Sequence, residues 1–216
     1  MAIKNNQKKR YSYFCHDSRN SFFLNKNFNK TNSFKTNFSN SKFSNCGLIS
    51  SKFKFCSFYN AIFDNCYIRG SLFKKCNLTN TNFRNCIVSS SVFERSKLNN
   101  CQFIDCIVLD KNQLLDSCQF CNTEILSCFP YEKQFDSRLI REVRVLRENF
   151  FIRRSTILHR KKGKLETLSI KYLCRVFDES FLIQNISKLS ALIEKEFYSL
   201  SYIINILNKI RSWYII

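Results

Sequence analysis

The residues of this chain that could carry chemistry are its twelve cysteines and two histidines. The segment Cys-Gln-Phe-Cys at 118–121, with Cys128 nearby, has the pair spacing of a zinc site. His16 and His159 both lie in basic surroundings, and the chain has no Ser–His–Asp order, no glycine-rich phosphate loop and no HExxH sequence. The residue types therefore predict no catalytic residue, no cofactor and no enzyme activity.

The cysteines belong to a longer pattern, which must position them. Every fifth residue from Phe38 to Val108 is apolar, and a small side chain such as Ser41, Cys46 or Ser51 stands two residues before each. A strict period of five fits neither a helix, with a period of 3.6, nor a flat strand, with a period of 2. The pattern therefore indicates a repeat architecture rather than separate helices or strands.

The repeat unit resembles that of the pentapeptide-repeat family, as in Thr-Asn-Phe-Arg-Asn from Thr81 and Cys-Asn-Leu-Thr-Asn from Cys76. The resemblance covers about residues 21–128. It implies a right-handed, four-sided β-solenoid with one pentad per side and with the central and small residues pointing inward. Eight cysteines then become inward packing residues, reduced in a cytoplasmic protein: Cys46, Cys56, Cys66, Cys76, Cys86, Cys101, Cys106 and Cys118.

In this register Cys118 points inward and Cys121 points outward, so the pair does not converge on a metal ion. We therefore expect no metal site in the chain, although the spacing of the pair leaves a zinc site as the alternative.

A second period, of twenty residues, supports four sides per coil. Phe23, Phe43, Phe63, Phe83 and Phe103 share this spacing and should stack on one side. Asparagine follows the same count at the ends of two sides, at positions 25, 45, 65 and 85 and at positions 40, 60, 80 and 100. Because Asn tolerates left-handed backbone, these positions should be corners. After Val108 the phase breaks, and Leu115, Phe120 and Ile125 resume it displaced by two, so we expect a bulge near residues 111–114.

The repeat divides the chain into three parts. Residues 1–20 read as a basic N-terminal arm, residues 21–128 as the β-solenoid and residues 129–216 as an α-helical region. In the last part, apolar residues at helical spacing predict helices over about 139–150, 165–183 and 187–213. We expect this region to pack on the open end of the solenoid, because a short rod needs its ends capped.

The chain carries 35 Lys and Arg against 16 Asp and Glu, a net charge of +19. Such a balance favours acidic partners, namely nucleic acid, an anionic membrane or an acidic protein surface. A Lys, Asn, Ile and Phe bias from an AT-rich genome would explain the same composition. No apolar run reaches the roughly eighteen residues of a membrane span, and the N-terminus lacks the apolar core of a secretory signal. We therefore expect a cytoplasmic protein.

Three binding functions compete. The first is a non-enzymatic scaffold that acts through protein–protein interaction. The second is nucleic acid or an anionic membrane bound by the basic C-terminal region, whose densest patch gives the predicted partner-binding residues Arg153, Arg154, Arg160, Lys161, Lys162 and Lys164.

The third comes from a family branch that resembles duplex DNA in size, shape and charge and protects DNA gyrase from quinolones. That resemblance implies an acidic rod. Residues 21–128 instead have 13 basic and 6 acidic side chains, a net charge of +7.

Overall fold

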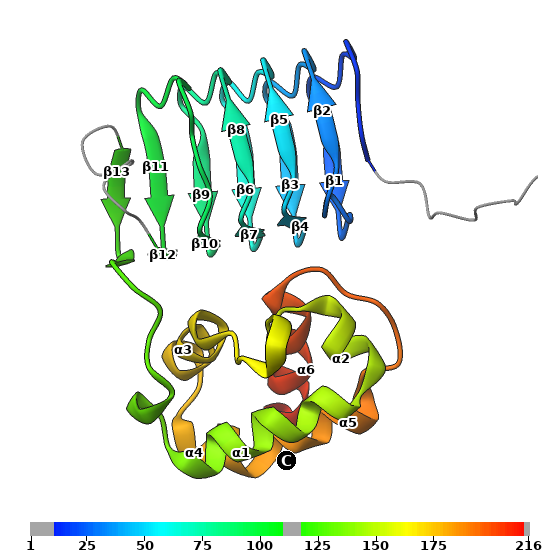
Figure 1. Ribbon diagram of the computed structural model, residues 1–216, viewed down its shortest axis with the longest axis vertical. Coiled ribbons are helices and arrows are strands. Elements are labelled where there is room, and N and C mark those ends of the chain that lie inside the picture. The colour runs from blue at the N-terminus through cyan, green and yellow to red at the C-terminus, as the bar shows by residue number, and fades with distance from the viewer. Residues whose placement is uncertain (1–10, 110–117, 214–216) are drawn as a thin grey trace, which may run out of the picture.

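The computed structural model describes residues 11–109 and 118–213. They form a parallel β-solenoid and a layer of helices that lies along the solenoid (Figure 1). One side is a six-stranded sheet of β1 (Phe22–Leu24), β3 (Lys42–Ser44), β6 (Ile62–Asp64), β9 (Asn82–Arg84), β11 (Cys101–Ile104) and β13 (Cys118–Cys121). A second is a five-stranded sheet of β4 (Gly47–Ile49), β7 (Tyr67–Arg69), β10 (Ile87–Ser89), β12 (Ile107–Leu109) and β14 (Glu124–Leu126). A third is a three-stranded sheet of β2 (Asn32–Phe34), β5 (Lys52–Lys54) and β8 (Leu72–Lys74).

The register confirms the four-sided coil. Phe43 pairs with Phe63, and Phe63 with Phe83, so each strand lies beside the strand twenty residues away. The fourth side has isolated parallel bridges with the same step, such as that of Asn37 with Ser57. At the far end Phe103 pairs with Phe120, seventeen residues on. The predicted change of phase is therefore confirmed, whereas Leu115 and the bulge expected near residues 111–114 lie outside the described residues.

A column of phenylalanine rings fills the interior. Phe63 is fully buried, and its ring stacks on Phe43 with centroids 4.7 Å apart and on Phe83 at 4.9 Å. Since strands of neighbouring coils lie about 4.8 Å apart, one ring per coil at this position packs without a gap. Burial of each such ring stabilises the fold by about 2–3 kcal/mol.

The small inward residues hydrogen-bond from one coil to the one before. Ser51 Oγ donates to the carbonyl oxygen of Phe28 at 2.7 Å, Thr81 Oγ1 to that of Phe58 at 2.8 Å, and Cys66 Sγ to that of Phe43 at 3.3 Å. Each donor reaches the carbonyl twenty-three residues earlier. A side chain here must be small, and the hydrogen bond explains why most positions have Ser, Thr or Cys, although Ala61 fills one without a donor. The buried cysteines are all free, as predicted: Cys46, Cys56, Cys66, Cys76, Cys86, Cys101 and Cys106.

The coil turns through a left-handed residue at each corner. The asparagines at 40, 45, 60, 65, 80, 85 and 100 all have positive φ, as their spacing predicted. The corner after the three-stranded sheet differs, because Lys35, Phe55, Lys75 and Arg95 occupy it with φ between 48° and 57°. Left-handed backbone costs an ordinary residue about 1–2 kcal/mol, so these side chains are placed there at a cost in stability.

The solenoid begins before the predicted boundary at residue 21. Phe14 forms a parallel bridge with Phe34, and Asp17 with Asn37, so residues 11–20 already follow the coil. Tyr13 packs edge-on against the buried ring of Phe38, with centroids 5.6 Å apart. These aromatic contacts over the first coil remove residues 11–20 from the predicted basic arm. Residues 1–10 lie outside the described residues.

The C-terminal region is helical but more broken than predicted. Its α-helices are α1 (Ser137–Val145), α2 (Phe150–Ser155), α3 (Thr167–Val176), α4 (Glu179–Asn185), α5 (Leu189–Leu192) and α6 (Leu200–Ser212). Short 3-10 turns are η1 (Glu132–Gln134), η2 (Leu146–Glu148), η3 (Lys161–Gly163) and η4 (Ile186–Lys188). The helices expected over 165–183 and 187–213 are interrupted at Phe177 and Ile193, which have extended backbone. Both side chains are buried in the core.

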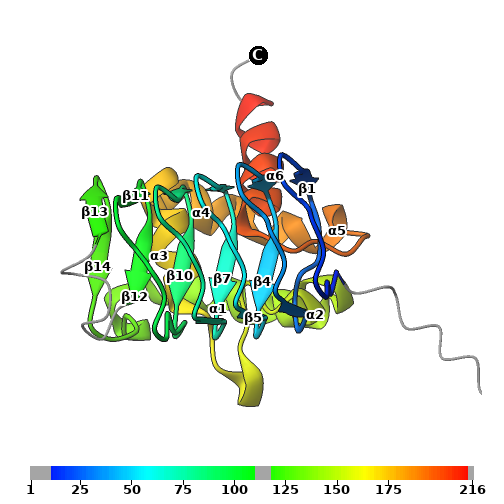
Figure 2. The same ribbon diagram turned by 90° about the horizontal axis from the view of Figure 1, so that it is seen from above.

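The helical layer packs on the five-stranded side of the solenoid and not on its open end, so that expectation was wrong. Figures 1 and 2 show the helices lying along the strands of this side. The outward side chains of Tyr67, Ile87 and Ile107 are buried there in one core with the helices. Gly47 lies twenty residues before Tyr67, at the same position of the preceding coil. A Cβ at Gly47 would lie only 2.6 Å from the carbonyl oxygen of Tyr198, so no larger residue fits there. The physical reason is that the outward residues of this side are apolar at the same position in three successive coils, at Tyr67, Ile87 and Ile107.

Replacing Phe63 tests the register. Phe63→Ala should leave a cavity between Phe43 and Phe83 and lower the free energy of unfolding by about 3–5 kcal/mol. Asp64→Ala, one residue along on the outer surface, should lower it by less than about 1 kcal/mol. Chemical denaturation of both variants measures the difference. Equal losses would contradict the inward placement of Phe63.

The buried thiols predict a fall in stability at alkaline pH. Burial raises the pKa of Cys66, Cys86 and Cys106, whereas thiols of the unfolded chain ionise near pH 8.5. The stabilisation is complete below that pH and is lost as pH rises above it. Three thiols give a slope of about 4 kcal/mol per pH unit.

Urea denaturation with reducing agent between pH 7.5 and 10.5 measures this slope. The triple variant Cys66→Ser, Cys86→Ser and Cys106→Ser is the matched control, because Ser51 fills the same kind of position and donates the same hydrogen bond. Its stability should depend much less on pH. Identical pH profiles for the two proteins would show that these thiols do not remain protonated in the fold.

Candidate partner-binding groove

The predicted basic residues come from two separate elements. Arg153 and Arg154 are exposed in the last turn of α2. Lys161, Lys162 and Lys164 are exposed around η3, the turn of a short hairpin. The hairpin is closed by a hydrogen bond from the amide of Arg160 to the carbonyl oxygen of Lys164, at 2.7 Å.

Arg160 does not belong with the exposed residues. It is half-buried, with its guanidinium 4.0 Å from the ring centroid of Phe129. Its Nε donates to the carbonyl oxygen of Leu165 at 3.0 Å and lies 3.9 Å from Glu166 Oε2. Arg154 also has partners within the chain, because it lies over the ring of Phe150 and 3.6 Å from Glu196. Arg160 therefore holds the hairpin in place and is poorly available to a partner.

Glu166 joins the solenoid to the helical layer. Its side chain is fully buried, and its Oε2 lies 2.6 Å from Arg69 Nη1 of β7. Arg69 also donates to the carbonyl oxygen of Thr156 at 3.0 Å and to Thr156 Oγ1 at 2.8 Å. Burial raises the pKa of Glu166, and the positive charge of Arg69 opposes the rise. No substrate can reach a carboxylate enclosed in this way, so the cluster is an ionic clamp between the two layers.

The two histidines do not form a site. His159 is buried and its Nε2 donates to the carbonyl oxygen of Val143 at 2.8 Å. Burial lowers the pKa of His159, so the ring is neutral at physiological pH. His16 is exposed and stacks on Tyr13 at the other end of the chain. In the described residues no group of three His, Cys, Asp or Glu side chains could hold a metal ion.

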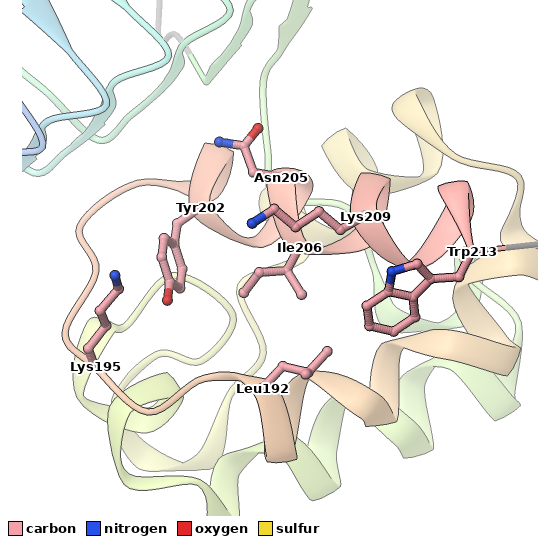
Figure 3. Close-up of a pocket in the computed structure, with 7 residues that line it drawn as sticks. All are labelled: Leu192, Lys195, Tyr202, Asn205, Ile206, Lys209 and Trp213. Carbon is pink, nitrogen blue, oxygen red and sulfur yellow. The ribbon is translucent and has the colours of Figure 1, made fainter.

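A groove on the helical layer is better suited to a partner (Figure 3). It has a volume of about 570 Å³ and lies between α6 and the chain that follows α5. Leu192 faces Ile206 across it, with Lys195 at one end and Trp213 at the other. Its lining consists of Leu192, Lys195, Tyr202, Asn205, Ile206, Lys209 and Trp213.

The groove exists because α6 is apolar on two faces. One face is buried against the core, through residues such as Leu207 and Ile210. On the other, Tyr202, Ile206 and Trp213 recur at steps of four and seven, which places them in one stripe of the helix. Trp213 is 61% exposed and Leu192 of α5 41% exposed. Tyr202 and Ile206 are half-buried, so this second stripe is only partly covered by the rest of the layer, which is unusual for a surface helix. This stripe was not predicted from the sequence, although the spacing of Tyr202, Ile206 and Trp213 indicates it.

The groove carries positive charge and no carboxylate among its lining residues. The ammonium group of Lys195 lies 5.8 Å from the ring centroid of Tyr202, and neither Lys195 nor Lys209 makes an ion pair within residues 11–109 and 118–213. Burial raises the pKa of Tyr202, and the nearby charge of Glu194 adds to the rise. An acidic side chain placed over the groove would therefore meet two cations that are not already held in an ion pair.

A family model for the pentapeptide repeat region matches residues 36–126, which are the regular coils described above. Residues 36–126 are a pentapeptide-repeat region. This region carries the helical layer on one side, and the groove belongs to that layer. None of the helices in the described parts of the chain is both long and apolar enough to cross a membrane.

Several solved pentapeptide-repeat structures match part of the chain at low identity. Rfr23 from the cyanobacterium Cyanothece 51142 is 12% identical, with a TM-score of 0.35 over 52% of this chain and 86% of that chain. HetL from Nostoc sp. strain PCC 7120, a protein involved in heterocyst differentiation regulation, is 14% identical, with a TM-score of 0.27 over 47% and 45%. QnrB1, a plasmid-mediated fluoroquinolone resistance protein, is 17% identical, with a TM-score of 0.25 over 53% and 70%. No curated protein sequence matches the chain.

Breaking the ionic clamp should loosen the helical layer. Arg69→Met leaves Glu166 buried without its main counter-charge and should lower the free energy of unfolding by about 3–5 kcal/mol at pH 7.5. The loss should shrink towards pH 4.5, because a carboxyl with a raised pKa takes up a proton there and needs no partner. Denaturation of the variant at both pH values measures the effect.

Two variants serve as controls. Glu166→Gln in the Arg69→Met background removes the buried charge and should recover much of the lost stability. Arg84→Met, an exposed arginine on the six-stranded side, should have little effect at either pH. A pH-independent loss, or no recovery in the double variant, would contradict the role assigned to Glu166.

Proposed function

We propose that this chain is a non-enzymatic binding protein, and that its groove takes an amphipathic segment of a partner protein bearing leucine-like and acidic side chains. The observation that carries the proposal is the partly covered apolar stripe of α6, which ends in the exposed Trp213, is closed on one side by Leu192 and is flanked by Lys195 and Lys209. The function is therefore protein–protein interaction, with the solenoid as a rigid support.

The chemistry of the groove supports this class of partner. Peptide-binding grooves commonly take the apolar face of a helix, whose side chains recur at steps of three and four residues. Trp and Tyr are frequent hot spots in such contacts, since they bury much area and lose little conformational entropy. The two lysines add selection by charge, because a basic segment of the same hydropathy would leave like charges facing each other. The groove thus favours an acidic amphipathic segment over a basic one.

Trp213 is the single tryptophan of the chain and reports directly on the groove. The probe is an amphipathic peptide of about fifteen residues, with leucine on one face and glutamate on the other, titrated into the full chain. Its binding should shift the emission of Trp213 to shorter wavelength in a saturable way. The same peptide with lysine in place of glutamate should have no such effect at equal concentration.

Charge reversal gives the sharper result. The double variant Lys195→Glu and Lys209→Glu should reverse the preference and bind the lysine peptide. The double variant Lys161→Glu and Lys164→Glu, two exposed changes at the hairpin outside the groove, is the matched control and should keep the preference of the natural sequence. If neither peptide changes the emission of Trp213, or if the control variant behaves like the groove variant, the groove does not bind such segments.

A further inference from the structure

The three-stranded side of the solenoid collects positive charge. With the corner that follows it, this side carries Lys35, Lys52, Lys54, Lys74, Lys75 and Arg95 on its outer surface. The remaining Lys and Arg of residues 11–109 are Arg69 in the ionic clamp and, elsewhere on the solenoid, Arg19, Lys26, Lys30, Lys42, Arg84 and Lys97. A compositional bias towards lysine would spread the charges evenly over the four sides. Here six of the thirteen lie on one side.

The same side exposes a line of aromatic rings. Phe14 is 74% exposed and stacks on Phe34 with centroids 5.3 Å apart. Phe34 contacts Phe55 edge-on at 5.4 Å, and Phe55 is 45% exposed. The ammonium groups of Lys35 and Lys75 lie 5.5 Å and 5.2 Å from the ring centroids of Phe34 and Phe55. We call these three rings and the six basic residues of this side the aromatic–lysine face.

The positions of these side chains are unfavourable for the fold itself. Phe55, Lys75 and Arg95 occupy left-handed corners, where two other corner columns of the solenoid use asparagine. A phenylalanine gains nothing from this backbone, and nearly half of its surface is open to water. Its contacts with Phe34 and Lys75 offset only part of the cost of this backbone, and they leave the rest of the ring open to a ligand.

The charges of the face are largely unmatched. Lys74 pairs with Glu94 at 2.6 Å. Within the described ranges of the chain, the other five basic residues of the face have no ion pair. Neighbouring coils lie about 4.8 Å apart, so these cations stand close to one another with few counter-charges, an arrangement that a bound polyanion would stabilise.

We propose that the aromatic–lysine face binds single-stranded nucleic acid, with phosphates at the lysines and bases stacked on the exposed rings. Proteins that bind single strands without sequence preference combine a basic track with aromatic side chains on which bases stack. A duplex offers phosphates to the lysines but hides the faces of its bases from the phenylalanines. The interleaving of rings and cations thus favours a single strand. This site is separate from the groove, and its test does not depend on the peptide experiment.

The experiment measures the affinity of the full chain for a fluorescently labelled oligothymidylate of about 15 nucleotides, by anisotropy at several salt concentrations. The logarithm of the binding constant should fall linearly with the logarithm of the salt concentration. The triple variant Lys54→Gln, Lys75→Gln and Arg95→Gln should reduce this slope by about 2, since each lost phosphate contact on a single strand removes about 0.7. A duplex of the same length should bind more weakly than the single strand.

The matched control is the triple variant Lys42→Gln, Arg84→Gln and Lys97→Gln, which removes the same charge from other sides of the solenoid. It should keep the slope of the natural sequence. If both triple variants lose affinity equally, binding depends on net charge and not on this face, and the proposal is wrong.

The rings are tested by variants that separate binding from folding. Phe55→Asn places the residue preferred at corners, so its stability to denaturant should equal or exceed that of the natural sequence, while its affinity for oligothymidylate should fall about tenfold at every salt concentration. Phe14→Ala should weaken binding to a similar extent, and Phe55→Tyr should retain it. Unchanged affinity in Phe55→Asn would contradict stacking.

Two further results would overturn the proposal. The first is no binding of the natural sequence to oligothymidylate at or below about 0.1 M salt, the range in which phosphate contacts are strong. The second is binding only to phosphatidylserine vesicles, lost in Phe55→Asn and in the first triple variant, because the face would then be a membrane-docking surface.

Discussion

The hydrogen bond from most of the small inward side chains to a carbonyl oxygen of the preceding coil is the interaction on which the structure depends. It fixes the distance between coils at the point where the chain turns inward, as for Ser51 on Phe28 and Thr81 on Phe58. The central apolar residue then lands above its equivalent, so that rings such as Phe63 and Phe83 stack at 4.9 Å. A side of five residues leaves space for one small and one large inward side chain. The inside of every coil is therefore nearly the same, and the differences between sides lie on the outside.

The outer columns decide what each side does. A column is a set of positions twenty residues apart. When the residue at this position has the same character in each coil, the column forms a continuous strip along the rod. The strip of Tyr67, Ile87 and Ile107 is apolar and is buried under the helical layer. Gly47 extends it with a residue small enough for the backbone of Tyr198 to approach. A strip of lysine and phenylalanine on another side stays exposed. The same scaffold thus supports a fixed intramolecular interface on one side and an open surface on another.

Much of the solenoid could be predicted from the sequence because its determinants are local and periodic. The period of five gave the sides, the period of twenty gave the register, and the displaced phase placed Phe120 under Phe103. The docking of the helices depends on contacts between distant segments, such as Arg69 with Glu166, and no local rule indicates those. The apolar residues Tyr67, Ile87 and Ile107 at outward positions do indicate the docking side. The prediction used only the inward positions and therefore did not include them. The predicted basic patch treated Arg160 as equivalent to Lys161, whereas its packing on Phe129 appears only in three dimensions.

The arrangement of the two layers determines how two binding surfaces on one chain could act together. The clamp of Arg69 and Glu166, with the apolar strip around it, joins the helical layer to the solenoid. Coupling between two sites requires a structural element with two arrangements that both ligands influence. A continuous core between the layers offers no such element in the described residues, and the coil offers none because its hydrogen bonds repeat in each turn. A protein of this construction would bring two partners together by holding them on one body, and occupation of one surface would leave the affinity of the other unchanged.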